Sequence, residues 1–445
     1  MSPLLASVRD TVRTQLWPLP AGGVLLALAA GIGLPRLDLH LNGRLPLWLT
    51  PLLFDGDPGS AQTLLDAIAS SLITVTSLTF SLTVLTLQLA SSQFSPRLLR
   101  TFTSDVFVQS TLAIFLATFT YALTVLRAIR SGGGGEPAFV PRISVTVAFV
   151  LGIVSVVGLV LFLAHLARQL RVETMLRDVH DDAIATLRSA TRPLEGAPPQ
   201  PKPPDPPATA VAITAPKSGF MTSINEAELL SAAIEASAHL MIECYPGCSI
   251  IEGVPIGVAW SDSGSLDDAA LDRLRSGVST AITVGHERTA AQDVGYGLRQ
   301  LTDVANKALS PGINDPTTAI HAVSHISAIL CQLAGRELGP VTLRDDTGRV
   351  RVALRRPNLA DVVEVAISQP RRYGSTDPQV MERLFRLLEE LAWHVDDEAL
   401  VGDQLARLRA TVTRSDFDHA EIARLARAAQ RVEEVITHHR DGGVR

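Results

Sequence analysis

The chain has 445 residues, of which 47% are hydrophobic and 19% are charged. This composition excludes a disordered or collagen-like chain. The net charge of -6 excludes a global positive field that would attract DNA or RNA, so we expect no nucleic-acid partner. Three cysteines cannot form a disulfide framework in a chain of this length, and their odd number is typical of a reducing compartment.

Charge is distributed unevenly along the chain. Residues 1–168 contain 10 Lys and Arg and 7 Asp and Glu, so the remaining residues contain 29 and 38 and carry a net charge of -9. A nearly uncharged first part followed by an acidic second part is typical of a membrane domain followed by a soluble domain. This distribution predicts a membrane domain over residues 1–168.

Uncharged stretches precede residue 169, and a helix needs roughly 20 apolar residues to cross the hydrocarbon core. We predict four transmembrane helices, at about residues 19–35, 67–96, 106–126 and 143–163. The first stretch is short and contains Pro20, Gly22 and Gly23, so its alternative interpretation as part of a signal peptide stays open. Four spans place both termini on one side. The flanking arginines favour that side by seven to five, which predicts cytoplasmic N- and C-termini.

The second uncharged stretch, residues 67–96, carries a polar stripe. As a helix it would extend about 45 Å, which exceeds the ~30 Å hydrocarbon core. At 100° per residue, seven of its polar side chains fall on one face, whereas most of its threonines lie on the other side. The stripe consists of Ser70, Thr74, Ser77, Ser81, Gln88, Ser92 and Ser95.

Two interpretations of this stripe remain open. Small hydroxyl residues let helices pack closely in a membrane. Hydroxyl and amide groups also line wetted pores, where they replace part of an ion's hydration shell. The length of the stripe and the presence of Gln88 slightly favour a pore. Arg97 and Arg100 follow it and would favour anions at a cytoplasmic mouth, although positive-inside anchoring is the simpler explanation.

The second half of the chain is predicted in four parts. Residues 169–192 continue the fourth membrane helix as a cytoplasmic extension, and residues 193–207 contain eight prolines and form a semi-rigid linker. Residues 208–260 predict a small β-rich module, and residues 261–445 predict a mainly helical module. The expected fold is therefore an α-helical membrane domain with four transmembrane helices, followed by a mixed α+β, mainly helical, cytoplasmic domain.

Charged and polar residues that could bind a ligand cluster around two predicted helices, at residues 287–309 and 316–333. Asp315 is the expected N-cap of the second helix, with Pro316 at its first position. A helix N-terminus binds anions through its free amides, but a capped corner with surface ion pairs explains the same residues. The candidates for this ligand site or structural corner are Glu287, Arg288, Asp293, Arg299, Asp303, Asn314, Asp315 and Thr317.

The sequence predicts neither a metal site nor an enzyme. His321 and His325 lie one helical turn apart, but no third ligand lies in sequence range. There is no Walker loop and no G-x-G-x-x-G, G-x-S-x-G or H-E-x-x-H motif. We therefore expect no catalytic residue and no cofactor.

Several segments resemble a known family. They are Ser70-Ser71-Leu72-Ile73-Thr74, the run Leu-Ala-Ser-Ser-Gln-Phe-Ser-Pro-Arg at 89–97, Glu287-Arg288-Thr289, Gln292-Asp293, and the run Ala-Leu-Ser-Pro-Gly-Ile-Asn-Asp-Pro at 308–316. They are similar to the bacterial predicted-membrane-protein family called domain of unknown function two-two-five-four, over nearly the whole chain. The resemblance implies the membrane and cytoplasmic domains described above and no established activity. We accordingly expect a multi-pass protein of the bacterial plasma (inner) membrane.

One polar-striped helix cannot enclose a pore, so the pore interpretation requires a homo-oligomer. We expect an ion channel, anion-favouring or weakly selective, that the cytoplasmic domain regulates. The alternative is a membrane-anchored sensor or scaffold without transport activity. The expected partners are the lipid bilayer, further copies of the chain and a small anion or other inorganic ion.

Overall fold

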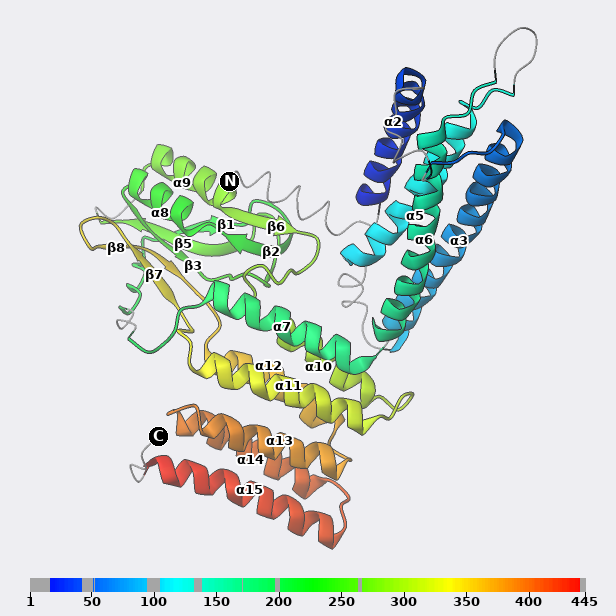
Figure 1. Cartoon of the computed structure of the whole chain (residues 1–445). Coiled ribbons are helices and arrows are strands. Elements are labelled where there is room, and N and C mark those ends of the chain that lie inside the picture. Colours follow the sequence, from blue (N-terminus) through cyan, green and yellow to red (C-terminus); the bar gives the residue numbers. More distant parts are fainter. Residues whose placement is uncertain are drawn as a thin grey trace. The chain divides into compact units, whose positions relative to one another are not determined.

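The computed structural model describes the chain except for residues 1–16, 42–50, 52, 94–104, 132–137, 170, 197–200, 263–265 and 441–445. Side chains of residues 41, 90–93, 439 and 440 are also outside the description. The chain divides into two compact units, Met1–Arg171 and Val172–Arg445 (Figure 1). Each unit is described by itself.

The first unit is a bundle of long apolar helices, drawn in blue to green in Figure 1. They are α2 (Pro18–Leu41), α3 (Pro58–Gln93), α5 (Val106–Leu126) and α6 (Arg142–Gln169). Helix α5 contacts the other three, and its buried face includes Leu112, Phe115 and Tyr121. Gly31 of α2 lies so close to Thr124 of α5 that a Cβ atom there would approach the Thr124 Cβ to 2.7 Å. Small residues therefore set the spacing of these helices, as in other membrane bundles.

Two of these helices are longer than the sequence predicts. Helix α3 begins at Pro58 because Asp57 accepts a hydrogen bond from the Ser60 amide at 3.3 Å, and proline suits the first helical position. Helix α2 continues through Pro35 to Leu41 and includes Asp38, so the bundle is not free of carboxylates.

Asp38 of α2 is buried, and its carboxylate caps the N-terminus of α6. Its carboxylate accepts hydrogen bonds from the amides of Ile143 and Ser144, at 3.1 and 3.0 Å, and from the Ser144 hydroxyl at 2.7 Å. These amides belong to the first turn of α6, where no carbonyl of the same helix is available. A side chain from α2 thus satisfies the beginning of α6.

The second unit begins with helix α7 (Val172–Ala190), whereas α6 ends at Gln169, although the sequence predicts one continuous helix here. Met175, Leu176, Val179 and Leu187 of α7 are buried, and the helix lies against α10 (Tyr296–Ala308) and α11 (Pro316–Ala334). The predicted extension is therefore a part of the second unit, because its apolar stripe requires burial.

The described residues of the second unit form two sheets. The strands are β1 (Val211–Thr214), β2 (Gly219–Ile224), β3 (Ala238–Ile242), β4 (Ser249–Ile250), β5 (Pro255–Ser261), β6 (Ile282–Gly285), β7 (Val341–Arg344) and β8 (Val350–Leu354). One sheet has the order β1-β5-β3-β8-β7 and the other β4-β2-β6. Strands β3 and β8 are parallel, with Leu240 opposite Val352, and the other pairs are antiparallel.

The β-rich part is therefore not confined to residues 208–260. Strands β6, β7 and β8 come later in the chain, so the predicted boundary at residue 260 does not separate two modules. Strand β3 explains why: it is almost fully buried, and without β8 one of its edges would present unpaired backbone groups. A distant segment supplies the missing partner.

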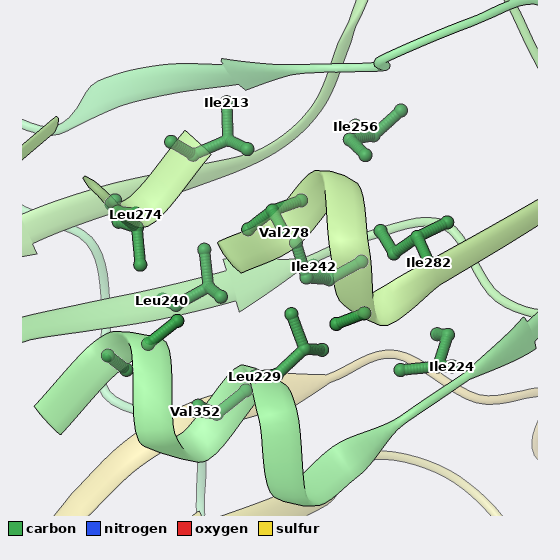
Figure 2. Close-up of a cluster of buried hydrophobic side chains, with 14 of the residues drawn as sticks. Ile213, Ile224, Leu229, Leu240, Ile242, Ile256, Leu274, Val278, Ile282 and Val352 are labelled. Atoms are coloured by element: carbon green, nitrogen blue, oxygen red, sulfur yellow. The ribbon is translucent and has the colours of Figure 1, made fainter. Parts of the chain in front are cut away.

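Two helices cover the core of these sheets. They are α8 (Glu226–Glu235) and α9 (Asp268–Ala281). Figure 2 shows Leu229 of α8, Leu274 of α9 and Leu240, Ile242 and Val352 of the sheet pointing into the same buried space. Burying each such side chain contributes roughly 1.5–3 kcal/mol to folding.

The rest of the second unit is helical, as predicted. Helices α12 (Leu359–Tyr373), α13 (Pro378–Ala392), α14 (Glu398–Arg414) and α15 (His419–Arg440) follow the sheets. Among the described residues, five helices are long and apolar enough to cross a membrane: α2, α3, α5, α6 and also α11. Helix α11 packs against α7, α10, α12 and α13 within its own unit, so its composition alone does not decide between a span and a core helix.

Candidate functional site

Helix α3 buries one polar face in its own bundle. Thr76, Thr79, Thr83 and Thr86 are buried, and α3 lies against α5 and α6. Each of these hydroxyls donates a hydrogen bond to the carbonyl four residues earlier, at 2.7–2.9 Å. The threonines are thus satisfied within α3 and form a packing face.

The predicted polar stripe lies on the opposite, outer face of α3. Ser70, Thr74, Ser77, Ser81 and Gln88 are all exposed in the single chain. Ser70 and Thr74 donate to the carbonyls of Asp66 and Ser70, at 2.7 and 3.1 Å. For Ser77, Ser81 and Gln88, the described part of the chain contains no side-chain hydrogen-bond partner. Lipid tails offer none either, so this face favours contact with water or another chain.

Apolar side chains border the stripe on both sides. Leu78 and Leu85 are exposed on one side, and Ile73 and Phe80 are exposed on the other. The exposed half of α3 therefore has a polar centre and apolar borders. Such a helix could turn its centre toward an aqueous axis and its borders toward neighbouring helices or lipid.

The cavity that adjoins α3 is a separate feature. A hollow of about 410 Å³ lies between α3 and α6, lined by residues such as Leu72, Val75, Phe149 and Ile153. Its lining is almost entirely apolar and includes none of the stripe residues. It offers no hydrated path for an ion.

Part of the predicted pore lies outside the described residues. Ser95, Arg97 and Arg100 belong to the undescribed segment 94–104, and the Ser92 side chain is also outside the description. Their roles at a cytoplasmic mouth stay predictions.

The predicted corner in the second half divides into two separate places. Arg288 and Asp293 lie before α10, whereas Asn314 and Asp315 follow it. A helix of 13 residues extends about 20 Å, so the two groups lie at opposite ends of α10. Thr317 and Glu287 are exposed, and Asp303 lies on α10 between the two ends. The structure therefore does not assemble these residues into one site.

The first place is a buried ion pair. Nε of Arg288 donates to Oδ2 of Asp293 at 3.0 Å, and the amide of Gly295 donates to Oδ1 at 3.1 Å. The Asp293 side chain is 2% exposed, and its burial raises the pKa of its carboxyl, although Arg288 and the more distant Arg299 oppose the shift. Gly247 covers the pair with φ +101, and a Cβ atom there would approach Asp293 Oδ2 to 2.3 Å. Only glycine fits this turn.

The neighbouring Gln292 fastens the same loop to a strand. Its side-chain oxygen accepts from the Ile224 amide at 2.9 Å, and its nitrogen donates to the Ile224 carbonyl at 3.2 Å. The sequence predicts that this helix begins at residue 287. In the structure α10 begins at Tyr296, and the contacts of Gln292 explain the difference. Side chains that bond distant backbone groups compete with helix formation. The loop from Arg288 to Asp293 is therefore a structural anchor.

The second place is a helix cap. The carboxylate of Asp315 accepts from the Thr318 amide at 3.1 Å, and it is the N-cap of α11, with Pro316 next to it. Asn314 adopts φ +50, a left-handed conformation that asparagine tolerates. Asp315 thus has the capping role that the sequence predicts.

Replacing Asp315 by alanine is expected to lower the free energy of unfolding of the second unit by about 1 kcal/mol, and Asp315→Ser by much less. The Thr318 hydroxyl, which bonds the carboxylate, lowers the pKa of Asp315. The contribution of the cap is therefore present above the ordinary carboxyl pKa and is lost as the pH falls below it. Urea unfolding followed by tryptophan fluorescence measures both effects. Equal losses for the alanine and serine variants would contradict the capping role.

The second unit contains a polar cavity that the sequence does not predict. A hollow of about 320 Å³ lies among the end of α7, strand β7 and the turn at Tyr245. Arg356 spans its wall by donating to the Ala190 carbonyl at 3.0 Å and to the Glu226 carboxylate. Arg356 and Glu226 thus already have partners within the chain. These residues lie far apart in sequence and in no motif, so no local signal could have found them.

No metal centre is visible in the described segments. They contain no group of three His, Cys, Asp or Glu side chains placed to hold a metal ion. Cys244, Cys248 and Cys331 are free thiols. Burial raises the pKa of the Cys244 and Cys331 thiols.

Comparison with known proteins establishes the family. The family model described as "Predicted membrane protein (DUF2254)" matches residues 13–390. The chain belongs to the DUF2254 family. Two similar relatives are "Uncharacterized protein Rv1290c" of Mycobacterium tuberculosis (strain ATCC 25618 / H37Rv) and "Uncharacterized protein Mb1321c" of Mycobacterium bovis (strain ATCC BAA-935 / AF2122/97). Each is 34% identical over 443 residues, which are 97% of this chain and 82% of the relative.

No solved structure matches the chain. Membership of the DUF2254 family, together with the long apolar helices of the first unit, identifies a multi-pass membrane protein. The family description gives no activity.

Proposed function

We propose that this DUF2254 protein is an oligomeric ion channel whose pore is lined by the outer polar face of α3. The observation that carries the proposal is the orientation of this helix. Thr79 and Thr83 are buried in the bundle and bond their own backbone, whereas Ser77, Ser81 and Gln88 are exposed on the opposite face. Hydroxyl and amide groups in that position replace part of the hydration shell of a passing ion.

Several copies are needed to enclose such a pore. Each copy contributes one α3, and the exposed Ile73, Phe80, Leu78 and Leu85 on the borders of the stripe suit contacts with neighbouring helices. The four helices of the first unit cross the plasma (inner) membrane, and both termini and the second unit lie in the cytoplasm. The second unit then regulates opening.

The alternative is a membrane-anchored sensor or scaffold. Ser70 and Thr74 bond their own helix, as they would in a seam between packed copies. In that case the stripe is a dry contact, and no ion passes.

Ion flux through the purified protein in liposomes separates the two functions. Chloride and potassium flux are each measured with protein-free liposomes as the control, under varied voltage and membrane tension. Flux of either ion supports the channel. No flux of either ion from a well-folded oligomer overturns it in favour of the sensor.

Arg97 tests the predicted anion preference of the pore. Reversing its charge with Arg97→Glu should shift the reversal potential in a chloride gradient toward cation selectivity, because a charged ring at a pore mouth sets selectivity. Arg427→Glu makes the same change of charge on an exposed position of α15 and serves as the control. An unchanged reversal potential in the Arg97 variant would contradict a role of this residue in selectivity.

A further inference from the structure

Helix α7 is the element through which the chain enters the second unit. Helix α6 ends at Gln169, and α7 begins at Val172, where the second unit starts. Within that unit α7 is held by α10 and α11.

Two histidines meet where α7 lies on α11. The rings of His180 on α7 and His325 on α11 have centroids 5.1 Å apart in an edge-to-face arrangement. The Nδ1 atom of His180 is buried and has no hydrogen-bond partner among the described residues. His321 lies one turn before His325 on the same helix. No neighbouring group therefore fixes a proton on this nitrogen of His180.

Burial and the neighbouring histidines oppose a positive charge on His325. Burial, followed by the nearby His180 and His321, lowers the pKa of His325, and Asp181 of α7 opposes the shift. Burial and the neighbouring Asp178 and Asp181 raise the pKa of the Asp182 carboxyl.

Further charged groups belong to the helices that enclose the contact. Arg177 lies on α7, and Arg299, Asp303 and Lys307 lie on α10, the other helix that packs on α7.

We propose that the His180–His325 contact is a pH-sensitive latch, which holds α7 against α11 when His325 is neutral and releases it when His325 is protonated. Histidine is the side chain whose ordinary pKa, about 6.5, allows such a change in the physiological range. Because docking disfavours the charged form of His325, this ring binds fewer protons in the docked state than in the released state. Docking is therefore fully present above the ordinary histidine pKa and weakens as the pH falls below it. The raised pKa of Asp182 acts in the opposite direction. This latch rests on packing within the second unit and does not depend on the proposed channel.

Amide hydrogen exchange of the full-length protein in detergent tests the latch. Protection factors of α7 are measured at pH 7.5 and pH 5, with correction for the intrinsic pH dependence of exchange. In the wild type, protection of α7 should fall severalfold at pH 5, because protonation of His325 favours the released state. In the double variant His180→Gln/His325→Gln, which cannot gain charge at these positions, protection should stay nearly constant.

His394→Gln is the matched control, because His394 is exposed at the end of α13 and should leave the wild-type response intact. Thermal unfolding at pH 7.5 checks that each variant is folded. If the double variant does not fold, His325→Gln alone carries the test, since it removes the ring whose charged form the docked state disfavours and should show a smaller loss than the wild type. Constant protection of α7 in the wild type, or an undiminished loss in the variants, would overturn the latch.

Discussion

Replacing Ser81 by leucine is expected to abolish ion flux through liposomes that contain the protein, whereas Ser81→Thr is expected to retain flux. Ser81 is exposed on the outer face of α3, near the middle of the uncharged stretch 67–96. In a narrow conduit lined by several copies, one leucine from each copy forms a hydrophobic constriction that excludes water and ions. Threonine keeps the hydroxyl and adds only a methyl group. Single-channel recording or liposome flux of both ion classes gives the measurement.

Thr83 supplies the matched control on the opposite face of the same helix. It is buried, and its hydroxyl donates to the Thr79 carbonyl at 2.9 Å. Thr83→Val preserves the shape of the side chain and removes this hydrogen bond, which costs about 0.5–1.5 kcal/mol of stability. Flux per folded oligomer should therefore stay at the wild-type level. Equal loss of flux in the Ser81→Leu and Thr83→Val variants would show that α3 acts through packing and that its outer face is not the pore wall.

Replacing Arg288 by methionine is expected to destabilise the second unit by about 3–5 kcal/mol, because it leaves a buried carboxylate without its partner. Asp293 is 2% exposed and lies beneath the Gly247 turn. The pKa of Asp293 is already raised by burial in the wild type, and loss of Arg288 removes the main opposing effect. The variant should therefore be closest to wild-type stability at acid pH and lose stability as the pH rises above the ordinary carboxyl pKa. Urea unfolding at several pH values provides the test.

Two comparisons show whether the unpaired charge is the cause. The double variant Arg288→Met/Asp293→Leu removes both charges and should recover most of the lost stability, since apolar replacements of buried ion pairs are often neutral. Arg409→Met breaks the ion pair of Arg409 with Glu433 on the surface and should cost no more than about 1 kcal/mol. A similar loss in the Arg288 and Arg409 variants would contradict the special role of the buried pair.

The elements that the sequence predicts well are those specified by local pattern. The two polar faces of α3 follow from helical period alone, and the structure buries Thr76, Thr79, Thr83 and Thr86 on the face opposite the stripe. The same holds for the cap at Asp315, where an aspartate stands directly before a proline. In both cases the decisive information lies within a few turns of chain.

The features that the sequence could not predict depend on distant partners. Strand β3 is completed by β8, more than a hundred residues later, and no local pattern announces that pairing. The sequence predicts a helix from residue 287, but Gln292 is held by the backbone of Ile224, and this contact keeps the segment before α10 as a loop. His325 could be paired only with His321 from the sequence, whereas its ring contact is with His180 on another helix.

The cap that Asp38 provides for α6 has a consequence for the order in which the membrane bundle is made. Asp38 leaves the ribosome about a hundred residues before the amides of Ile143 and Ser144 that it binds. Until then its carboxylate has none of these donors, and an ionised group buried without partners is costly. We therefore expect the first helix to reach its final position only after α6 has been synthesised, when the amides of Ile143 and Ser144 are present.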